Sequence, residues 1–146
     1  MFKKILVASD FSVDADGALT QAINLARQSG GHLDIVHASL PDSFVLPPPL
    51  DLVALPPRAS TFEHVAQQVE ARVQRARDKG ISATGHTLTG PAPQAVIDHA
   101  RSAHADLIVV GTRGLGALAH TLLGSVAEKI VRHAPCPVLV VPRHER

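Results

Sequence analysis

The sequence predicts an α/β fold, in which a doubly wound, Rossmann-like sheet of five parallel strands carries helices on both faces. The first observation is that short apolar runs alternate with segments of helical periodicity along the chain. The second is that the first run, Ile5–Ala8, is apolar throughout, as in a strand buried on both faces. The third is that glycine and polar residues follow the first and fourth runs, at 8–10 and 111–116. Ligands bind such sheets where the strand order reverses, so these two strands should be neighbours, which gives the order 3-2-1-4-5.

The expected strands are a few residues long, and all but the third are rich in Val, Ile and Leu. They lie at Ile5–Ala8, Leu33–Ala38, Ile81–Leu88, Leu107–Val110 and Val138–Val141. Between the second strand and the next helix, residues 41–58 are rich in proline, so regular structure is not expected there. Their apolar content favours a docked loop within one domain that spans 1–146.

The expected helices are marked by caps and by apolar residues at helical spacing. Ser12 or Asp14 caps a helix over Ala15–Ser29, and Gly30–Gly31 stops it. The buried stripe of this helix is expected at Ala18, Leu19, Ala22, Ile23 and Ala26. The next helix, which Gly80 closes, should bury Phe62, Val65, Ala66, Val69, Val73 and Ala76. The last helix has apolar residues at helical spacing at Leu122, Leu123, Val126, Ile130 and Val131.

The sequence also predicts where the second and third helices begin. A capping box, Ser60 to Glu63, opens the second helix, because the two side chains can bond each other's backbone N–H groups. Pro91 or Pro93 opens the third helix, which is expected to run to about His104, since proline fits the first helical turn.

The stretch from Asp106 to Val131 is the most informative in the chain: a strand, a glycine-rich loop and a helix. Glycine has no side chain to hold a ligand away, and the N-terminus of a helix attracts anions. Four glycines with an adjacent Ser125 therefore favour phosphate binding. The alternative is that these glycines only serve turns. The glycines are Gly111, Gly114, Gly116 and Gly124.

At these residues the chain resembles the universal stress protein family, in its ATP-binding branch. The resemblance rests on the spacing of Gly111, Gly114 and Gly124–Ser125, on KKILVASDFS at 3–12 and on GSVAEKIVRHAPCPVLVVP at 124–142. It implies the same strand order, an adenine nucleotide such as ATP as ligand, and a homodimer. The nucleotide-binding residues expected in this sequence are Ala8, Ser9, Asp10, Ala38, Gly111, Thr112, Arg113, Gly114, Gly116, Gly124, Ser125 and Val126.

Two charged residues of the expected site have alternative roles. Asp10 either caps the following turn through the N–H groups of Ser12 or Val13, or faces the ligand and holds a ribose, an adenine edge or Mg²⁺ on the phosphates. Arg113 either pairs with phosphate or points to solvent. Strand Val138–Val141 would be an apolar edge strand, and bare edges tend to pair, so we expect a homodimer through antiparallel pairing of this strand.

Composition excludes several other functions. Aromatic residues are scarce, at four Phe, and the net charge is +1, so neither a base-stacking platform nor a polyanion or membrane surface is indicated. No signal peptide and no apolar run of transmembrane length is visible, and the single Cys136 fits a reducing compartment. These features predict a soluble, cytoplasmic protein. Between two prolines, Cys136 is expected to be a buried, inert thiol.

Other motifs fail. A P-loop, a GxGxxG fingerprint and a G-x-S-x-G elbow are absent from the sequence. A zinc site among the nine histidines is not expected, because His99 and His104 should point to different faces of their helix and no Asp or Glu completes a set. His37 is expected at the core or rim. Two functions remain: a regulatory module that binds ATP, which we favour, or a slow ATPase or nucleotidyl transferase using the same pocket.

Overall fold

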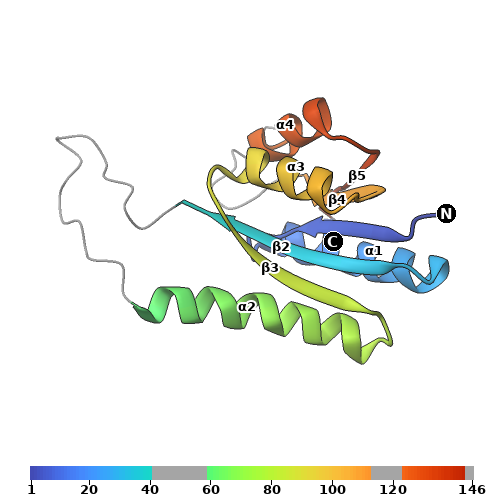
Figure 1. Cartoon of the computed structure of the whole chain (residues 1–146), viewed down its shortest axis with the longest axis horizontal. Coiled ribbons are helices and arrows are strands. Elements are labelled where there is room, and N and C mark those ends of the chain that lie inside the picture. Colours follow the sequence, from blue (N-terminus) through green and yellow to red (C-terminus); the bar gives the residue numbers. More distant parts are fainter. Residues whose placement is uncertain (41–58, 113–122, 144–146) are drawn as a thin grey trace.

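The computed structural model describes residues 1–40, 59–112 and 123–143 of the chain. Within these residues it has five strands and four helices in alternation (Figure 1). In chain order they are β1 (Lys4–Ala8), α1 (Val13–Ser29), β2 (His32–Ser39), α2 (Ala59–Asp78), β3 (Ala83–Thr89), α3 (Ala92–Ser102), β4 (Leu107–Gly111), α4 (Ser125–His133) and β5 (Val138–Val141). None of the described helices has the length and apolar character needed to cross a membrane.

The strands form one parallel sheet in the order β3-β2-β1-β4-β5, which confirms the predicted fold class and strand order. Strand β1 is central: its Val7 pairs with Ile35 of β2 and with Val109 of β4. Helices α3 and α4 cover one face of the sheet, and α1 and α2 cover the other (Figure 1). Buried apolar side chains fill both layers, so the central runs Ile5–Ala8 and Leu107–Val110 are apolar on both faces, whereas the edge strand β3 also carries threonine and histidine.

Side chains alternate between the two layers along each strand. On β1, Ile5 and Val7 belong to the core beneath α1 and α2. Leu6 belongs to the core beneath α3 and α4. Gly85 of β3 lets α2 approach closely, because an added β-carbon would lie 2.6 Å from Val69.

Both ends of α1 are formed by residues that the sequence predicted. Ser12 is the N-cap, and its Oγ accepts a hydrogen bond of 3.2 Å from the N–H of Ala15. Gly30 ends the helix in the left-handed region, at φ 67°, where an L side chain would be strained. The helix begins two residues earlier than predicted, at Val13, and all five residues of its predicted stripe are buried.

Several predicted boundaries and faces were wrong. Strand β3 starts at Ala83, because the N–H of Ile81 instead bonds the carbonyl of Ala76 at the end of α2. Helix α3 ends at Ser102 and does not reach His104, which has a positive φ of 53°. Helix α4 starts only at Ser125.

The predicted stripes of α2 and α4 were wrong in part. Phe62 of α2 is 54% exposed, and the buried residues Val69 and Val73 lie later in the helix, where it packs on Gly85 of β3. Helix α4 buries Ala127 and Ile130 but exposes Val126 and Val131. Leu122 and the side chain of Ser60 lie outside the described residues.

Candidate functional site

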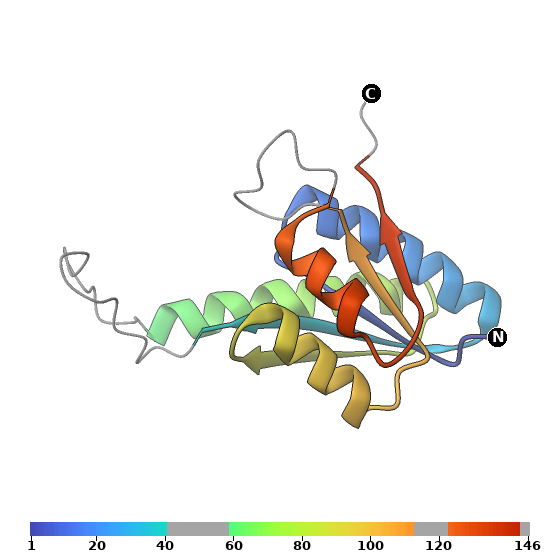
Figure 2. The same ribbon diagram turned by 90° about the horizontal axis from the view of Figure 1, so that it is seen from above.

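The candidate site lies at the carboxyl ends of β1 and β4, where the strand order reverses. Successive strands from β1 to β3 are added on one side of β1, and β4 and β5 on the other. The chain leaves β1 toward α1 and leaves β4 toward the opposite face, where α4 lies (Figure 2). In doubly wound sheets this divergence opens the crevice in which ligands bind.

The turn after β1 is held by its own polar groups. The N–H of Ser9 donates to the carbonyl of Val36 at 2.9 Å, and its Oγ accepts from the N–H of Phe11 at 3.1 Å. Asp10 Oδ1 accepts a hydrogen bond of 2.9 Å from the N–H of Ser12. Asp10 thus makes the turn cap that was one of its two predicted roles. Since a carboxylate accepts several hydrogen bonds, this contact does not settle its role toward a ligand.

His37 is half-buried near the carboxyl end of β2, which agrees with its expected place at the core or rim, and it is stacked on Phe11. The ring centroids are 4.2 Å apart and the planes are inclined by 13°. The Arg72 guanidinium lies over the Phe11 ring, 4.7 Å from its centroid. Nδ1 of His37 lies 2.8 Å from the carbonyl oxygen of Ser9, and a carbonyl only accepts, so Nδ1 carries the proton. The stack supports the backbone of Phe11, whose φ is +66°.

Gly111 is required at the end of β4 by packing. A β-carbon added there would lie 2.9 Å from the backbone carbonyl of Asp14, at the start of α1. Asp14 is itself buried, accepts a hydrogen bond of 3.4 Å from the Thr112 hydroxyl and lies 3.8 Å from Arg143 Nε. The sequence predicted Asp14 only as an alternative to Ser12 for the helix cap, which the structure assigns to Ser12, and did not predict this contact with the end of β4. The feature of the sequence that could have drawn attention to Asp14 is its position in the first helical turn, where carboxylates interact favourably with the helix dipole.

Gly124 and Ser125 form the N-terminus of α4 beside this strand end. The N–H of Gly124 donates to the carbonyl of Thr112, which fastens the helix start to the residue after β4. Gly124 is the N-cap, and because it has no side chain it offers no acceptor to the first-turn amides. Ser125 is exposed. Gly124 has φ −67°, which any residue adopts, so its backbone conformation does not require glycine.

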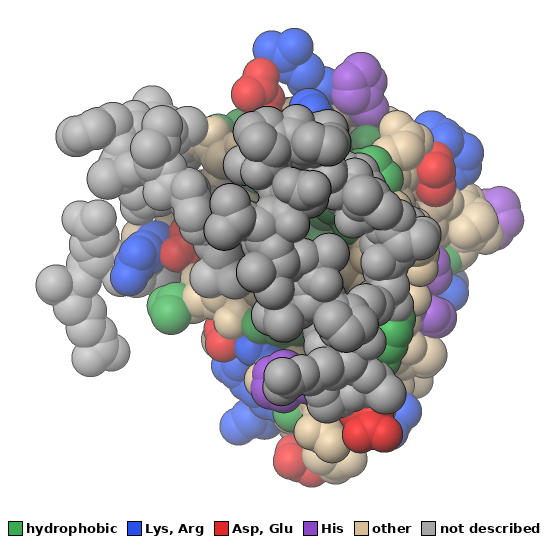
Figure 3. Space-filling view, turned by 90° about the vertical axis from the view of Figure 1, so that its left-hand side faces the viewer, with side chains coloured by type: hydrophobic (Ala, Val, Ile, Leu, Met, Phe, Trp, Pro, Cys, Tyr) green, Lys and Arg blue, Asp and Glu red, His purple; other side chains and the backbone are tan. Residues whose placement is uncertain are grey.

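The remaining predicted site residues divide into two groups. Ala8 and Ala38 lie at the carboxyl ends of β1 and β2, and Val126 is exposed in the first turn of α4. Arg113, Gly114 and Gly116 lie outside the described residues. Figure 3 looks onto this end of the molecule, and the described charged side chains around its rim are of both signs.

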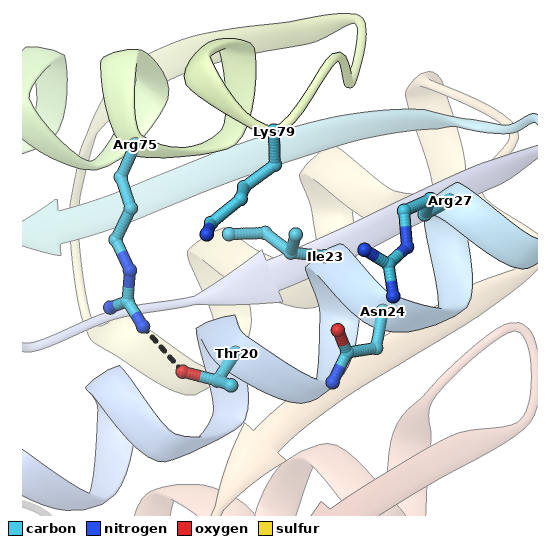
Figure 4. A pocket seen from close by; sticks show the side chains of 6 residues that line it. All are labelled: Thr20, Ile23, Asn24, Arg27, Arg75 and Lys79. Atoms are coloured by element: carbon cyan, nitrogen blue, oxygen red, sulfur yellow. Dashed lines mark hydrogen bonds between the residues drawn. The ribbon is translucent and has the colours of Figure 1, made fainter.

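A second surface feature, a groove between α1 and α2, lies away from the candidate site. It is lined by Thr20, Ile23, Asn24, Arg27, Arg75 and Lys79 (Figure 4). Arg75 bonds the Thr20 hydroxyl across it. These residues come from the middle and C-terminal parts of both helices, away from the start of α1, which adjoins the carboxyl ends of the strands. This basic groove is therefore separate from the predicted nucleotide site.

Comparison with known proteins identifies the family. The model of the universal stress protein family matches residues 1–142. The chain belongs to this family. It is 39% identical to a universal stress protein of Thermus aquaticus over 141 residues, covering 97% of this chain and 99% of the relative. Universal stress protein UspA from Lactobacillus plantarum superposes with a TM-score of 0.82 at 27% identity, covering 96% and 97% of the two chains.

The similar structures that hold a nucleotide include a universal stress protein in complex with cAMP, which superposes with a TM-score of 0.74 at 26% identity. The match covers 96% of this chain and 97% of that one.

The structure corrects the expectation for the histidines. His104 lies beyond the end of α3 and therefore shares no helix with His99, and Asp34 of β2 and His86 of β3 join His99 of α3 in one cluster. One ligand atom from each lies within 4.8 Å of the others. The expectation that no carboxylate completes a histidine set is therefore wrong. Sequence reasoning missed the cluster because its members lie on three separate elements.

Cys136 is half-buried at the entry to β5, packed against the core beneath α3 and α4. Burial raises the pKa of the Cys136 thiol above its ordinary value, and the charge of Asp106 raises it further. The thiol is thus protonated near neutral pH and poorly nucleophilic, in agreement with the predicted inert role.

Proposed function

We propose that the protein is a regulatory module that binds an adenine nucleotide, ATP in the first place, at the carboxyl ends of β1 and β4. The observation that carries the proposal is the start of α4. Its glycine N-cap leaves the first-turn amides without a side-chain acceptor, and the bond from Gly124 to Thr112 holds these amides beside the switch point. A phosphate supplies the missing acceptors and the negative charge that a helix N-terminus favours.

The family relationship supports an adenine nucleotide. A related universal stress protein binds cAMP. In this chain the phosphates would lie at Gly124, Ser125 and Val126, and the nucleoside toward Ala8–Asp10 and Ala38. Mg²⁺, where it accompanies the phosphates, would be held by Asp10.

Binding without rapid hydrolysis is favoured over catalysis. The sequence has no P-loop lysine, and one carboxylate at Asp10 is thin support for fast phosphoryl transfer. A slow ATPase is the alternative. A steady-state ATPase assay on the pure protein separates the two, with Gly124→Val as the blank.

The direct test is the nucleotide content of the protein. Protein purified without added ligand and then denatured is expected to release an adenine nucleotide, and the stripped protein to bind ATP in a calorimetric titration. Gly124→Val should lose this binding and remain folded, because its φ of −67° suits any residue. Unchanged ATP affinity in the folded variant would remove the helix-start site from the proposal.

We further propose a homodimer through β5, in a cytoplasmic setting. Strand β5 is an edge of the sheet, and its Leu139 is 37% exposed. Antiparallel pairing of Val138–Val141 about a two-fold axis would give hydrogen-bond partners to the backbone N–H and C=O groups along this edge. Light scattering at micromolar concentration should give the mass of a dimer, and a strictly monomeric mass would exclude this arrangement.

A further inference from the structure

The cluster of Asp34, His86 and His99 lies on the opposite part of the sheet from the nucleotide site. Asp34 is the third residue of β2, beside Leu6 of β1 in the register, so its side chain shares the face that α3 and α4 cover. His86 of β3 pairs with Val36, which belongs to the same core. His99 reaches this face from α3. Two neighbouring strands and one helix therefore direct one ligand atom each to a common point.

The carboxylate is the buried centre of the cluster. Asp34 is 3% exposed. His86 Nε2 lies 3.6 Å from its Oδ1, and His99 Nε2 lies 3.5 Å from its Oδ2. The two imidazole rings are 4.5 Å apart between centroids. Ligand atoms about 2.0–2.1 Å from a tetrahedral zinc ion are roughly 3.3–3.5 Å from one another, so the two histidine–carboxylate distances are close to those of a zinc site, and small side-chain shifts would bring the whole set, now within 4.8 Å, to that spacing.

His99 supplies the observation that points to a ligand. Its Nε2 is buried and, within the described part of the chain, has no hydrogen-bond partner. A buried nitrogen without a partner is costly. If Nε2 is deprotonated, its lone pair faces the Asp34 carboxylate, and the two repel. A cation between them would accept both the lone pair and the carboxylate.

His32 and Lys4 complete the surroundings of Asp34. His32 Nε2 lies 3.2 Å from Asp34 Oδ1, and its Nδ1 lies 2.7 Å from the Ser82 hydroxyl. A histidine held in this way orients a metal-binding carboxylate from the outer shell. Lys4 Nζ lies 3.7 Å from Oδ2, and its side chain is 38% exposed, so it can withdraw to solvent when a cation neutralises the carboxylate.

We infer that Asp34, His86 and His99 form a binding site for a divalent transition-metal ion of the Zn²⁺ class. Two imidazoles and one carboxylate suit Zn²⁺ and other divalent first-row transition metals, whereas Mg²⁺ and Ca²⁺ require more oxygen ligands. His86 is one-third exposed, so the fourth position is open to water on its side. The ion would join β2, β3 and α3. This inference does not depend on nucleotide binding.

Zinc titration of chelator-treated protein tests the site. Isothermal calorimetry should give one Zn²⁺ per chain, no binding of Mg²⁺, and an unfolding midpoint that rises with Zn²⁺. Asp34→Asn and His99→Ala should each weaken Zn²⁺ binding by roughly tenfold or more. The matched control is His64→Ala, which removes an exposed histidine of α2 on the other face and should leave the affinity unchanged.

Two results would overturn the inference: no stoichiometric zinc binding by the wild type, or affinity that is lost in His64→Ala but kept in Asp34→Asn and His99→Ala. A measurement on the wild type covers the case in which a variant does not fold. In ¹⁵N spectra of the histidine side chains, Zn²⁺ should shift the Nε2 signals of His86 and His99. Shifts confined to other histidines would equally exclude the site.

Discussion

The proposed nucleotide site and the Asp34 cluster use the same sheet in different ways. The first lies at the carboxyl ends of β1 and β4 and uses backbone N–H groups, glycines and a helix start. The second lies near the amino end of β2 and uses side chains from β2, β3 and α3. Apart from Ala38, residues of the first site fall in three short stretches of the sequence, whereas those of the second are dispersed. A site made of backbone therefore leaves a motif in the sequence, and a site made of side chains from several elements leaves none.

The largest expected effect tests whether the carboxyl end of β4 is shaped by packing or by ligand. Gly111→Ala should lower the free energy of unfolding by about 1–3 kcal/mol, because its β-carbon would press on the Asp14 backbone at 2.9 Å. Gly17→Ala in α1 is the control. No atom lies within 4 Å of its β-carbon, so it should stabilise by about 0.5–1 kcal/mol. Urea unfolding measures both. Wild-type stability in Gly111→Ala, with loss of ATP binding alone, would assign this glycine to the ligand.

The next effect separates the two sites. Ser125→Ala removes one hydroxyl from the start of α4 and leaves its amides in place, so ATP affinity should fall by about 1–2 kcal/mol, roughly tenfold. Adenosine, which has no phosphate, should lose less. Zinc binding at Asp34 should not change in this variant. Equal losses for adenosine and ATP would move Ser125 away from the phosphates.

Asp10→Ala tests the double role of that carboxylate. Loss of its bond to the N–H of Ser12 should cost about 1 kcal/mol of stability. If Asp10 contacts the nucleoside, affinities for adenosine and ATP should fall together. If it holds Mg²⁺, only the magnesium-dependent part of ATP affinity should fall. Titrations with and without Mg²⁺ distinguish these outcomes, and wild-type binding of every ligand would leave Asp10 as a turn cap only.

The smallest effect concerns Cys136, which belongs to neither site. Its pKa is raised in the folded state by burial and then by Asp106, so the unfolded chain loses the thiol proton first as the pH rises. Stability should therefore decline with pH above the ordinary thiol pKa, and Cys136→Ala should decline less. Unfolding measured from pH 7 to about pH 10 checks this. An identical alkaline limb in both proteins would contradict the raised pKa.

The sequence predicted the fold because its signals are local. Apolar runs such as Leu107–Val110 and the Ser12 cap depend on neighbours within a few residues. The order of the strands followed from the two polar strand ends and the topology rule for doubly wound sheets. For the nucleotide site, the residues at 8–10 and 124–126 were predicted, and the structure places both stretches at the same end of the sheet.

Tertiary structure decided the rest, because packing partners are not encoded by periodicity. Phe62 and Val131 have helical spacing and are nevertheless exposed, since the sheet contacts other parts of their helices. Gly111 proved necessary only because Asp14 approaches it from α1.

By itself, the sequence determined the approximate positions of the strands and helices and placed a glycine-rich stretch after β4, since those depend on backbone conformation and local polarity. Only the folded chain brought Asp34, His86 and His99 together. That meeting depends on strand register and on the rotation of α3 over the sheet, and both are set by side-chain packing between segments distant in the sequence.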